Sequence, residues 1–220
     1  AKNFTEFKKA LDMLAIPGYN IVYADRYDTI FYISNGRIPV RDKSYNWKTT
    51  LPGNTSKTLW TELHPLSDLP QVLQPKSGYV YNTNHSPFHS TFGMDNPVVK
   101  DATMGYETLE NNRSMRFDEL IRPLNKVSYE DFKRIKFDRQ FPSSFYFPSK
   151  IDSVFLLNST EFPDIADIIT QLNNWNRNSD VDNIGAGTFF FVQAAASNNK
   201  ALYLQNKTIG KSLAAQLLRE

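Results

Sequence analysis

The residues best suited to chemistry lie in one short segment, 78–87, which reads Gly-Tyr-Val-Tyr-Asn-Thr-Asn-His-Ser-Pro. The valine and tyrosines of Gly78–Tyr81 favour a strand, and Pro87 cannot continue a central ladder. We therefore expect a buried strand that ends before Asn82. Positions two apart on a strand face the same side, which predicts that Asn82 and Asn84 project together. The alternative is a loop in which both amides only satisfy neighbouring backbone groups.

The composition excludes several classes of function. The 220 residues carry a net charge of +2 and no dense cluster of Lys and Arg, so we expect neither a nucleic-acid nor an acidic-membrane partner. No apolar run reaches the roughly 18–20 residues of a membrane span. The absence of cysteine excludes thiolate metal sites and a cysteine nucleophile. We also expect no metal at His64, His85 and His89, because a spacing of four between the last two has no meaning in loop sequence.

The elements that precede this segment can be placed from periodicity. Apolar residues at helical spacing predict an amphipathic helix over 3–14, which a Pro-Gly pair ends. The runs 19–25 and 29–34 predict a hairpin with a short polar turn. The stretch 40–75 has almost no periodicity, and we expect a long surface loop anchored by its two tryptophans. Loops of this length are often functional.

The elements that follow the segment are mainly helical. Helices are expected over the ranges 106–124, 163–175 and 209–218. Asn111 or Asn112 is the expected cap of the first, and Ser128 with Asp131 has the outline of a capping box before a further helix. Periodicity does not decide between helix and strand for the apolar run 184–193. The high aromatic content, with 16 Phe and 11 Tyr, fits a mixed α and β chain with much loop.

Taken in chain order, these landmarks resemble the β-subunit of penicillin acylases, a pattern that acyl-homoserine-lactone acylases share. The match runs over nearly the whole chain, although single pieces such as Leu-Pro-Gly are uninformative alone. The residues that carry the resemblance are Ala1–Phe4, Tyr23-Ala24-Asp25, Gly36–Arg41, Leu51-Pro52-Gly53, Trp60, Leu69-Pro70, Pro75, Gly78-Tyr79, Asn82–Pro87, Arg113–Phe117, Ser128 with Asp131, Leu172–Asn176 and Gly185-Ala186.

This resemblance implies an N-terminal nucleophile hydrolase, a class in which a precursor cleaves itself to expose a serine whose own α-amino group is the base. A free α-amino group titrates near pH 8, so it can be neutral enough to accept the hydroxyl proton. The implied fold class is α+β, a partial αββα four-layer sandwich with a largely helical or irregular second half. Residue 1 is Ala, and the matching region begins after the family's nucleophile. We therefore expect the catalytic serine to lie outside this chain.

Position by position, the resemblance implies three site residues. Asn84 matches the asparagine whose amide donates to the oxyanion of the tetrahedral intermediate, where losing one donor typically costs roughly 100- to 1000-fold in rate. Arg113 matches an arginine near the nucleophile, where a cation helps to keep the α-amine neutral. Asp95 falls where the family has a calcium-ligand aspartate, which implies a structural calcium but no cofactor for the chemistry.

We therefore predict a fragment of an amide hydrolase that cleaves N-acyl bonds of β-lactams, acyl-homoserine lactones or related compounds and is inactive by itself. Its expected partners are the N-acyl small-molecule substrate and the remainder of the acylase precursor, namely the α-subunit and the start of the β-subunit. The family implies a periplasmic or secreted location. Residues 1–100 are expected to contribute sheet layers and the long wrapping loop, and 101–220 the mainly helical portion. The alternative is a catalytically inactive ligand-binding or structural module that uses Asn82 and Asn84.

Overall fold

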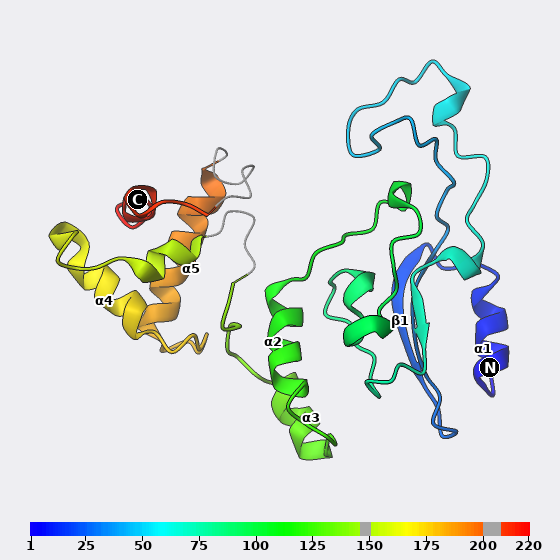
Figure 1. Cartoon of the computed structure of the whole chain (residues 1–220), viewed down its shortest axis with the longest axis horizontal. Coiled ribbons are helices and arrows are strands. Elements are labelled where there is room, and N and C mark those ends of the chain that lie inside the picture. Colours follow the sequence, from blue (N-terminus) through cyan, green and yellow to red (C-terminus); the bar gives the residue numbers. More distant parts are fainter. Residues whose placement is uncertain (146–150, 200–207) are drawn as a thin grey trace. The chain divides into compact units, whose positions relative to one another are not determined.

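The computed structural model describes residues 1–145, 151–199 and 208–220, and the chain divides into two units, Ala1–Glu110 and Asn111–Glu220 (Figure 1). Each unit has a hydrophobic core of its own. A three-stranded sheet with one helix and long loops makes up the first unit, and the described part of the second consists mainly of helices. This mixture confirms the expected α+β class.

The first unit begins with a helix followed by an antiparallel hairpin. α1 spans Phe4–Leu11, β1 Gly18–Ala24 and β2 Ile30–Gly36, and the short β3, Gln71–Leu73, pairs antiparallel with β2 in the order β1-β2-β3. The predicted hairpin is confirmed, and the predicted helix is present but ends three residues early. The early end follows from Leu14, whose backbone has left the right-handed helical region at φ +46°.

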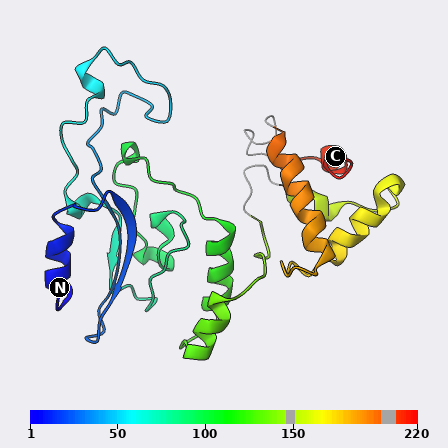
Figure 2. The same ribbon diagram turned by 180° about the vertical axis from the view of Figure 1, so that it is seen from behind.

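The two faces of the sheet pack against different parts of the first unit. On one face Phe31 and Ile33 are buried against the apolar side of α1. The opposite face carries Tyr32, fully buried, and Ser34. The segment between β3 and the end of the unit covers this second face, and its Tyr106 donates a hydrogen bond to the Ser34 carbonyl at 3.0 Å. Figures 1 and 2 show α1 on one side of the sheet and this green segment on the other.

The stretch from β2 to β3 is a long loop, as predicted, and extends away from the sheet (Figure 2). Its tryptophans do not anchor it equally. Arg41 lies over both rings, 5.5 Å from the centroid of Trp47 and 5.4 Å from that of Trp60, and it donates to the Thr103 carbonyl at 2.6 Å. Trp60 nevertheless remains 63% exposed. Arg41, rather than the indoles alone, therefore ties the base of the loop to the unit.

Short 3-10 helices punctuate the irregular parts of both units. They span Ser56–Thr58, Leu66–Asp68, Pro87–His89, Gly93–Asp95, Ala102–Met104, Ile151–Leu156 and Pro163–Ile165. Side-chain caps open several of them, including one at Ser86, whose hydroxyl accepts from the Phe88 N–H. Such single turns let a loop satisfy its backbone groups locally where no ladder is available.

Two capped helices open the second unit. α2 spans Asn112–Ile121 and α3 Tyr129–Lys136, and each begins with a reciprocal capping box, at Asn111 and at Ser128. Both predicted caps are confirmed, but α2 starts six residues later than predicted because its cap is Asn111. The Arg116 guanidinium donates two hydrogen bonds to the Asp138 carboxylate, at 2.8 and 3.0 Å, which ties α2 to the end of α3.

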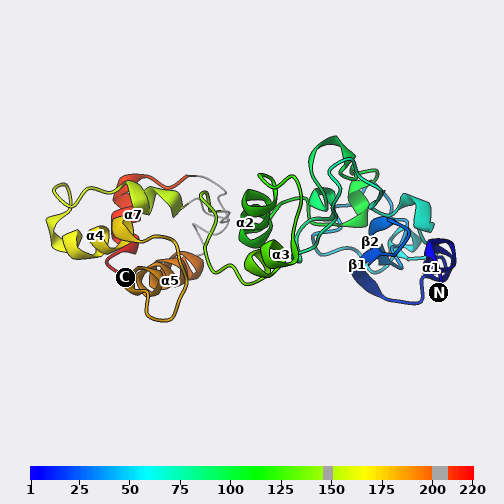
Figure 3. The same cartoon turned by 90° about the horizontal axis from the view of Figure 1, so that it is seen from below.

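The core of the second unit lies among α4, Ala166–Asn174, α5, Ile184–Asn198, and α7, Lys211–Leu217 (Figure 3). The run that the sequence left undecided is therefore helical. Trp175 stacks on Phe189 of α5 with ring centroids 5.0 Å apart. A Cβ added at Gly185 would lie 2.6 Å from the Trp175 Cβ, so this close approach requires glycine. The Arg177 guanidinium covers the aromatic cluster, 4.6 Å from the Phe145 ring centroid.

Candidate functional site

The predicted strand over Gly78–Tyr81 is wrong. Gly78 has φ +76°, and its N–H donates to the Pro75 carbonyl at 3.0 Å, so the segment begins with a turn. No strand in the described part of the first unit pairs with it. Its backbone groups bond instead to the loop that follows, with the Tyr81 N–H donating to the Ser90 carbonyl at 3.0 Å. Aromatic and β-branched residues favour a strand only where a neighbouring strand is present to pack against.

Because there is no strand, the prediction that Asn82 and Asn84 project from one strand face loses its basis. A hydrogen bond joins the two residues instead. The Asn82 Oδ1 accepts a hydrogen bond from the Asn84 N–H at 3.0 Å. Asn84 lies in the left-handed region at φ +57°, where asparagine is tolerated better than most residues. The Asn84 side chain is exposed. The arrangement is an Asx turn that presents Asn84 at its tip.

A buried histidine fixes the chain on the other side of Asn84. The His85 ring is 5% exposed and stacks on Tyr81 with centroids 4.7 Å apart. Its Nδ1 accepts from the Thr83 N–H at 3.1 Å, and its Nε2 lies 2.8 Å from the His89 carbonyl oxygen. A carbonyl only accepts, so the ring carries its proton on Nε2. Asn84 thus sits between two residues whose side chains are held by neighbouring groups.

The turn rests on the polar side of the sheet. The Asn82 amide nitrogen is buried and makes no hydrogen bond of good geometry, although the Asn82 side chain lies near enough to the Tyr32 phenol to affect its pKa. Burial raises the pKa of the Tyr32 phenol, the nearby Tyr106 adds to that rise, and the side chains of Ser34 and Asn82 oppose it. The Tyr32 hydroxyl itself donates to the Asn20 Oδ1 at 2.8 Å. Asn82 therefore spans from the Tyr32 hydroxyl, inside the unit, to the backbone of Asn84 at the surface.

Arg113, the second predicted site residue, belongs to the second unit. It lies in the first turn of α2, between Asn111 and Ser114, the two residues of the capping box, and its side chain is exposed. A cation at this end of a helix opposes the helix dipole and costs roughly 0.3–1 kcal/mol. The helix dipole therefore does not favour an arginine there. The neighbouring Arg116 is different, because its pairing with Asp138 gives it a structural role.

Asp95, the predicted calcium ligand, accepts a hydrogen bond from the Lys76 N–H at 2.6 Å and lies at the end of a 3-10 turn. Calcium takes six to eight oxygen ligands, usually with several carboxylates. No three His, Asp or Glu side chains gather in a metal-binding arrangement anywhere in 1–145, 151–199 or 208–220. The described surroundings of Asp95 therefore do not form a complete calcium site.

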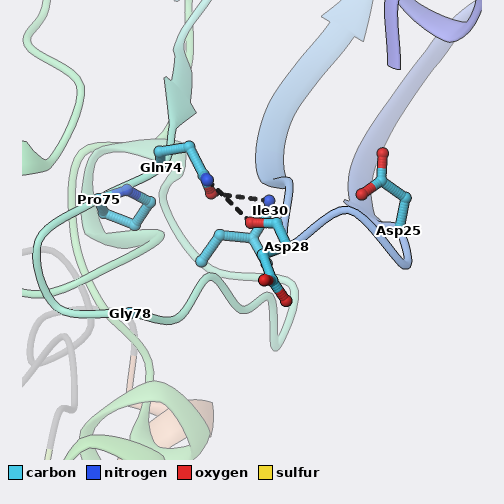
Figure 4. Close-up of a pocket in the computed structure, with 6 residues that line it drawn as sticks. All are labelled: Asp25, Asp28, Ile30, Gln74, Pro75 and Gly78. Carbon is cyan, nitrogen blue, oxygen red and sulfur yellow. Dashed lines mark hydrogen bonds between the residues drawn. The ribbon is translucent and has the colours of Figure 1, made fainter. Parts of the chain in front are cut away.

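A pocket of about 500 Å³ lies at the turn of the β1–β2 hairpin (Figure 4). The Gln74 side chain crosses it, donating to the Asp28 carbonyl at 2.8 Å and accepting from the Ile30 N–H at 2.9 Å. The Asp25 carboxylate accepts from the Tyr23 hydroxyl and two backbone N–H groups of the turn. Burial acts to raise the Asp25 pKa, but these hydrogen bonds outweigh it and hold the pKa below its usual value. The polar groups here stabilise the hairpin and the attachment of β3.

Sequence reasoning missed Tyr32 as a support of the site. A signal was present, because Asn20, Tyr32 and Ser34 lie on one face of the predicted hairpin and all three are polar. On an amphipathic strand such a row is usually taken as the exposed face. Here the following segment covers Tyr32 and Ser34, which are buried, while Asn20 stays exposed.

Comparison with known proteins agrees with the resemblance seen in the sequence. The profile of the penicillin amidase family matches residues 1–215. The penicillin G acylase of Escherichia coli is 36% identical over 87 residues, which cover 40% of this chain and 10% of that enzyme. No helix among the residues described is long and apolar enough to cross a membrane.

Among solved structures, a thermostable penicillin G acylase from Alcaligenes faecalis superposes with a TM-score of 0.66 at 19% sequence identity. The superposition covers 98% of this chain but 37% of the Alcaligenes chain. At this identity the likeness shows the fold alone. The chain has the fold of part of an acylase, and it spans well under half the length of each of these relatives.

Proposed function

The chain belongs to the penicillin amidase family, and on that premise we propose that it forms part of an amide hydrolase that cleaves linear N-acyl bonds. The substrates in this proposal are N-acyl small molecules such as acylated β-lactams or acyl-homoserine lactones. The catalytic serine is supplied by another part of the acylase polypeptide. The contribution of this chain is an amide donor that stabilises the negative charge of the tetrahedral intermediate.

The observation that carries the proposal is the presentation of Asn84. An oxyanion donor must be accessible to substrate and held in place before the reaction, because reorienting it during the reaction would cost much of its benefit. The Asn84 side chain is exposed, while its backbone N–H is bound by Asn82 and the following His85 is buried. A surface amide on a fixed turn meets both requirements.

Two further roles are part of the same proposal. Arg113 acts on the nucleophilic serine's α-amine, where a nearby cation disfavours protonation of the amine and so keeps it available as a base. Its exposed side chain at the N-terminal end of α2 is accessible to such an amine. Asp95 supplies one oxygen ligand to a structural calcium, with the remaining ligands coming from other parts of the polypeptide.

The partner in this proposal is the remainder of the acylase polypeptide, and the sheet of the first unit offers a place for it. In the described residues β1 pairs with β2 alone, so its other edge carries unpaired backbone groups over Gly18–Ala24. Tyr19 and Val22 on this strand are 61% and 50% exposed. An open edge of this kind favours pairing with another strand. We also infer export of the complete polypeptide, which cell fractionation would test.

The test replaces the donor. In the complete acylase polypeptide that carries this chain, Asn84→Ala is expected to lower kcat on a chromogenic acyl-anilide by roughly 100- to 1000-fold with little change in KM, because the interaction forms only in the transition state. Asn54→Ala serves as the control, since Asn54 is another exposed loop asparagine of the same unit. Its kinetics should equal those of the parent.

Two results would end the proposal. Full activity in the Asn84→Ala enzyme would remove the oxyanion role. Hydrolysis of the acyl-anilide by the 220-residue chain alone would show that the nucleophile lies within it. A calcium role for Asp95 is tested separately, by comparing the metal content and melting temperature of the complete polypeptide with and without Asp95→Asn.

A further inference from the structure

Asn84 occupies a backbone conformation that it does not hold by itself. A residue other than glycine at φ +57° lies in a sparsely populated region, and such conformations persist only where neighbouring groups fix them. The Asn84 backbone N–H donates to the Asn82 Oδ1 at 3.0 Å. This bond closes the turn and so determines the direction in which the Asn84 Cα–Cβ bond points.

The position of Asn82 suits it to fix the direction of the Asn84 Cα–Cβ bond. Its amide nitrogen is buried near the Tyr32 phenol. Tyr32 belongs to β2, and the other face of β2 packs against α1. The Asn82 amide oxygen reaches the surface turn. The amide is planar and rigid, so burial of its nitrogen end restricts the oxygen end, which accepts from the Asn84 N–H.

The buried nitrogen is informative for another reason. A buried donor that makes no hydrogen bond of good geometry typically costs about 1–3 kcal/mol, so this side chain does not hold its place through hydrogen bonding at the nitrogen. Aspartate would make the same turn without that donor, but it would bury a charge beside the phenol oxygen. Serine would also close a turn, more weakly and without reaching the sheet. Asparagine places an uncharged amide between the two ends.

We propose that Asn82 is the positioning residue of the amide donor Asn84: it sets the Asn84 side chain toward the reacting carbonyl and does not itself touch substrate. The inference rests on the proposed function of Asn84. Misplacement of a catalytic group by about 1 Å can reduce the rate by about 100-fold. Removing the Asn82 oxygen is therefore expected to lower kcat by roughly 10- to 100-fold, with KM nearly unchanged.

The first experiment compares two substitutions that differ by one oxygen atom, made in the complete acylase polypeptide. Asn82→Ala removes the acceptor for the Asn84 N–H, and Asn82→Ser keeps a side-chain oxygen that can accept from it. We expect the alanine variant to lose kcat and the serine variant, which closes the turn more weakly and does not reach the sheet, to recover part of that loss at a similar melting temperature. Equal kcat in the two variants would overturn the inference.

The second experiment separates positioning from a general structural role. In a double-mutant cycle, Asn82→Ala should change kcat by less than about twofold when Asn84 is already alanine, because a residue that acts only through Asn84 has nothing left to position. A full additive loss in the double variant would show that Asn82 acts independently and would refute the inference while leaving the role of Asn84 intact. An unchanged kcat in the Asn84→Ala single variant would refute both the oxyanion role of Asn84 and the positioning role of Asn82.

A third measurement does not depend on activity. Hydrogen exchange of the Asn84 backbone amide, followed by mass spectrometry with residue-level fragmentation, should be slow in the parent and in Asn82→Ser and faster in Asn82→Ala. The His89 N–H, which donates to the Ser86 carbonyl in the same loop, is the internal control and should be unaffected. Fast exchange at both positions in Asn82→Ala would mean that the loop unfolds, which would contradict a role confined to Asn84.

Discussion

Replacing Gly185 with alanine should destabilise the second unit although alanine is the better helix former. A Cβ at this position would meet the Cβ, Cγ and Cδ1 of Trp175 at 2.6, 2.7 and 2.8 Å. Carbon atoms in favourable contact lie about 3.5–4.0 Å apart, so the indole or the start of α5 must move by about 1 Å. The atoms involved are at the base of the Trp175 side chain and have little freedom to rotate away.

The size of the effect follows from two opposing terms. Overpacking of this kind costs about 1–3 kcal/mol, and alanine in place of glycine in a helix returns at most about 1 kcal/mol. We expect a net loss of about 1–2 kcal/mol. For a chain of this length that corresponds to a melting temperature lower by about 2–8 °C. Trp175 stacks on Phe189 in the core, so a displaced indole should also alter the near-ultraviolet circular dichroism.

Gly187 supplies the matched control, because it lies two residues further along the same helix and has nothing within 4 Å of an added Cβ. Gly187→Ala adds the same methyl group without the clash and should stabilise by up to about 1 kcal/mol. The assay is thermal and urea unfolding, followed by the fluorescence of Trp175, the one tryptophan of the second unit among the three in the chain. If Gly185→Ala proved as stable as Gly187→Ala, the packing of Trp175 on α5 would be wrong.

Three further predictions concern stability and association. Arg116→Gln should cost about 1.5–3 kcal/mol near neutral pH by removing the paired hydrogen bonds to Asp138. Those bonds lower the pKa of Asp138. Their contribution to stability is therefore present above the unfolded pKa of about 4 and is lost as the pH falls through the folded pKa. The unfolding free energies of variant and parent should converge below about pH 4. Ser128→Ala should cost about 1 kcal/mol through loss of the α3 cap, whereas Ser128→Thr should be nearly neutral, both read from urea midpoints. Val22→Lys should reduce concentration-dependent self-association of the 220-residue chain in sedimentation velocity while Val22→Thr does not, and equal association of both variants would argue against pairing through β1.

The parts of the fold that could be predicted from sequence are those whose stability is local. The hairpin β1–β2 follows from two apolar runs and a short polar turn, and the caps at Asn111 and Ser128 follow from side chains within three residues of the groups they bond. These features depend on neighbours along the chain. They are visible before any tertiary contact is known.

The failures have the opposite cause. Gly78–Tyr81 has the composition of a strand, but strand formation needs a partner that the sequence of the segment does not specify. The apolar run at Ile184 could not be assigned because it is apolar on every side, and only its packing beside α4 identifies it as the helix α5. The role of Tyr32 was hidden for the same reason, since its burial depends on a segment about 50 residues downstream, around Asn82.

The candidate site combines a local feature, which the sequence predicts, with a tertiary feature, which it does not. The Asx turn at Asn82 and Asn84 is local, and Asn-x-Asn sequences form such turns in many loops without function. What distinguishes this turn is its base, because Asn82 lies near the buried phenol of Tyr32 on the central strand β2 and the following His85 is buried against Tyr81. A turn of the same sequence on an open loop would sample several orientations, and an amide donor that must reorient loses most of its effect on the reaction. The sheet of the first unit therefore contributes to the proposed chemistry by restricting one exposed amide to a single orientation.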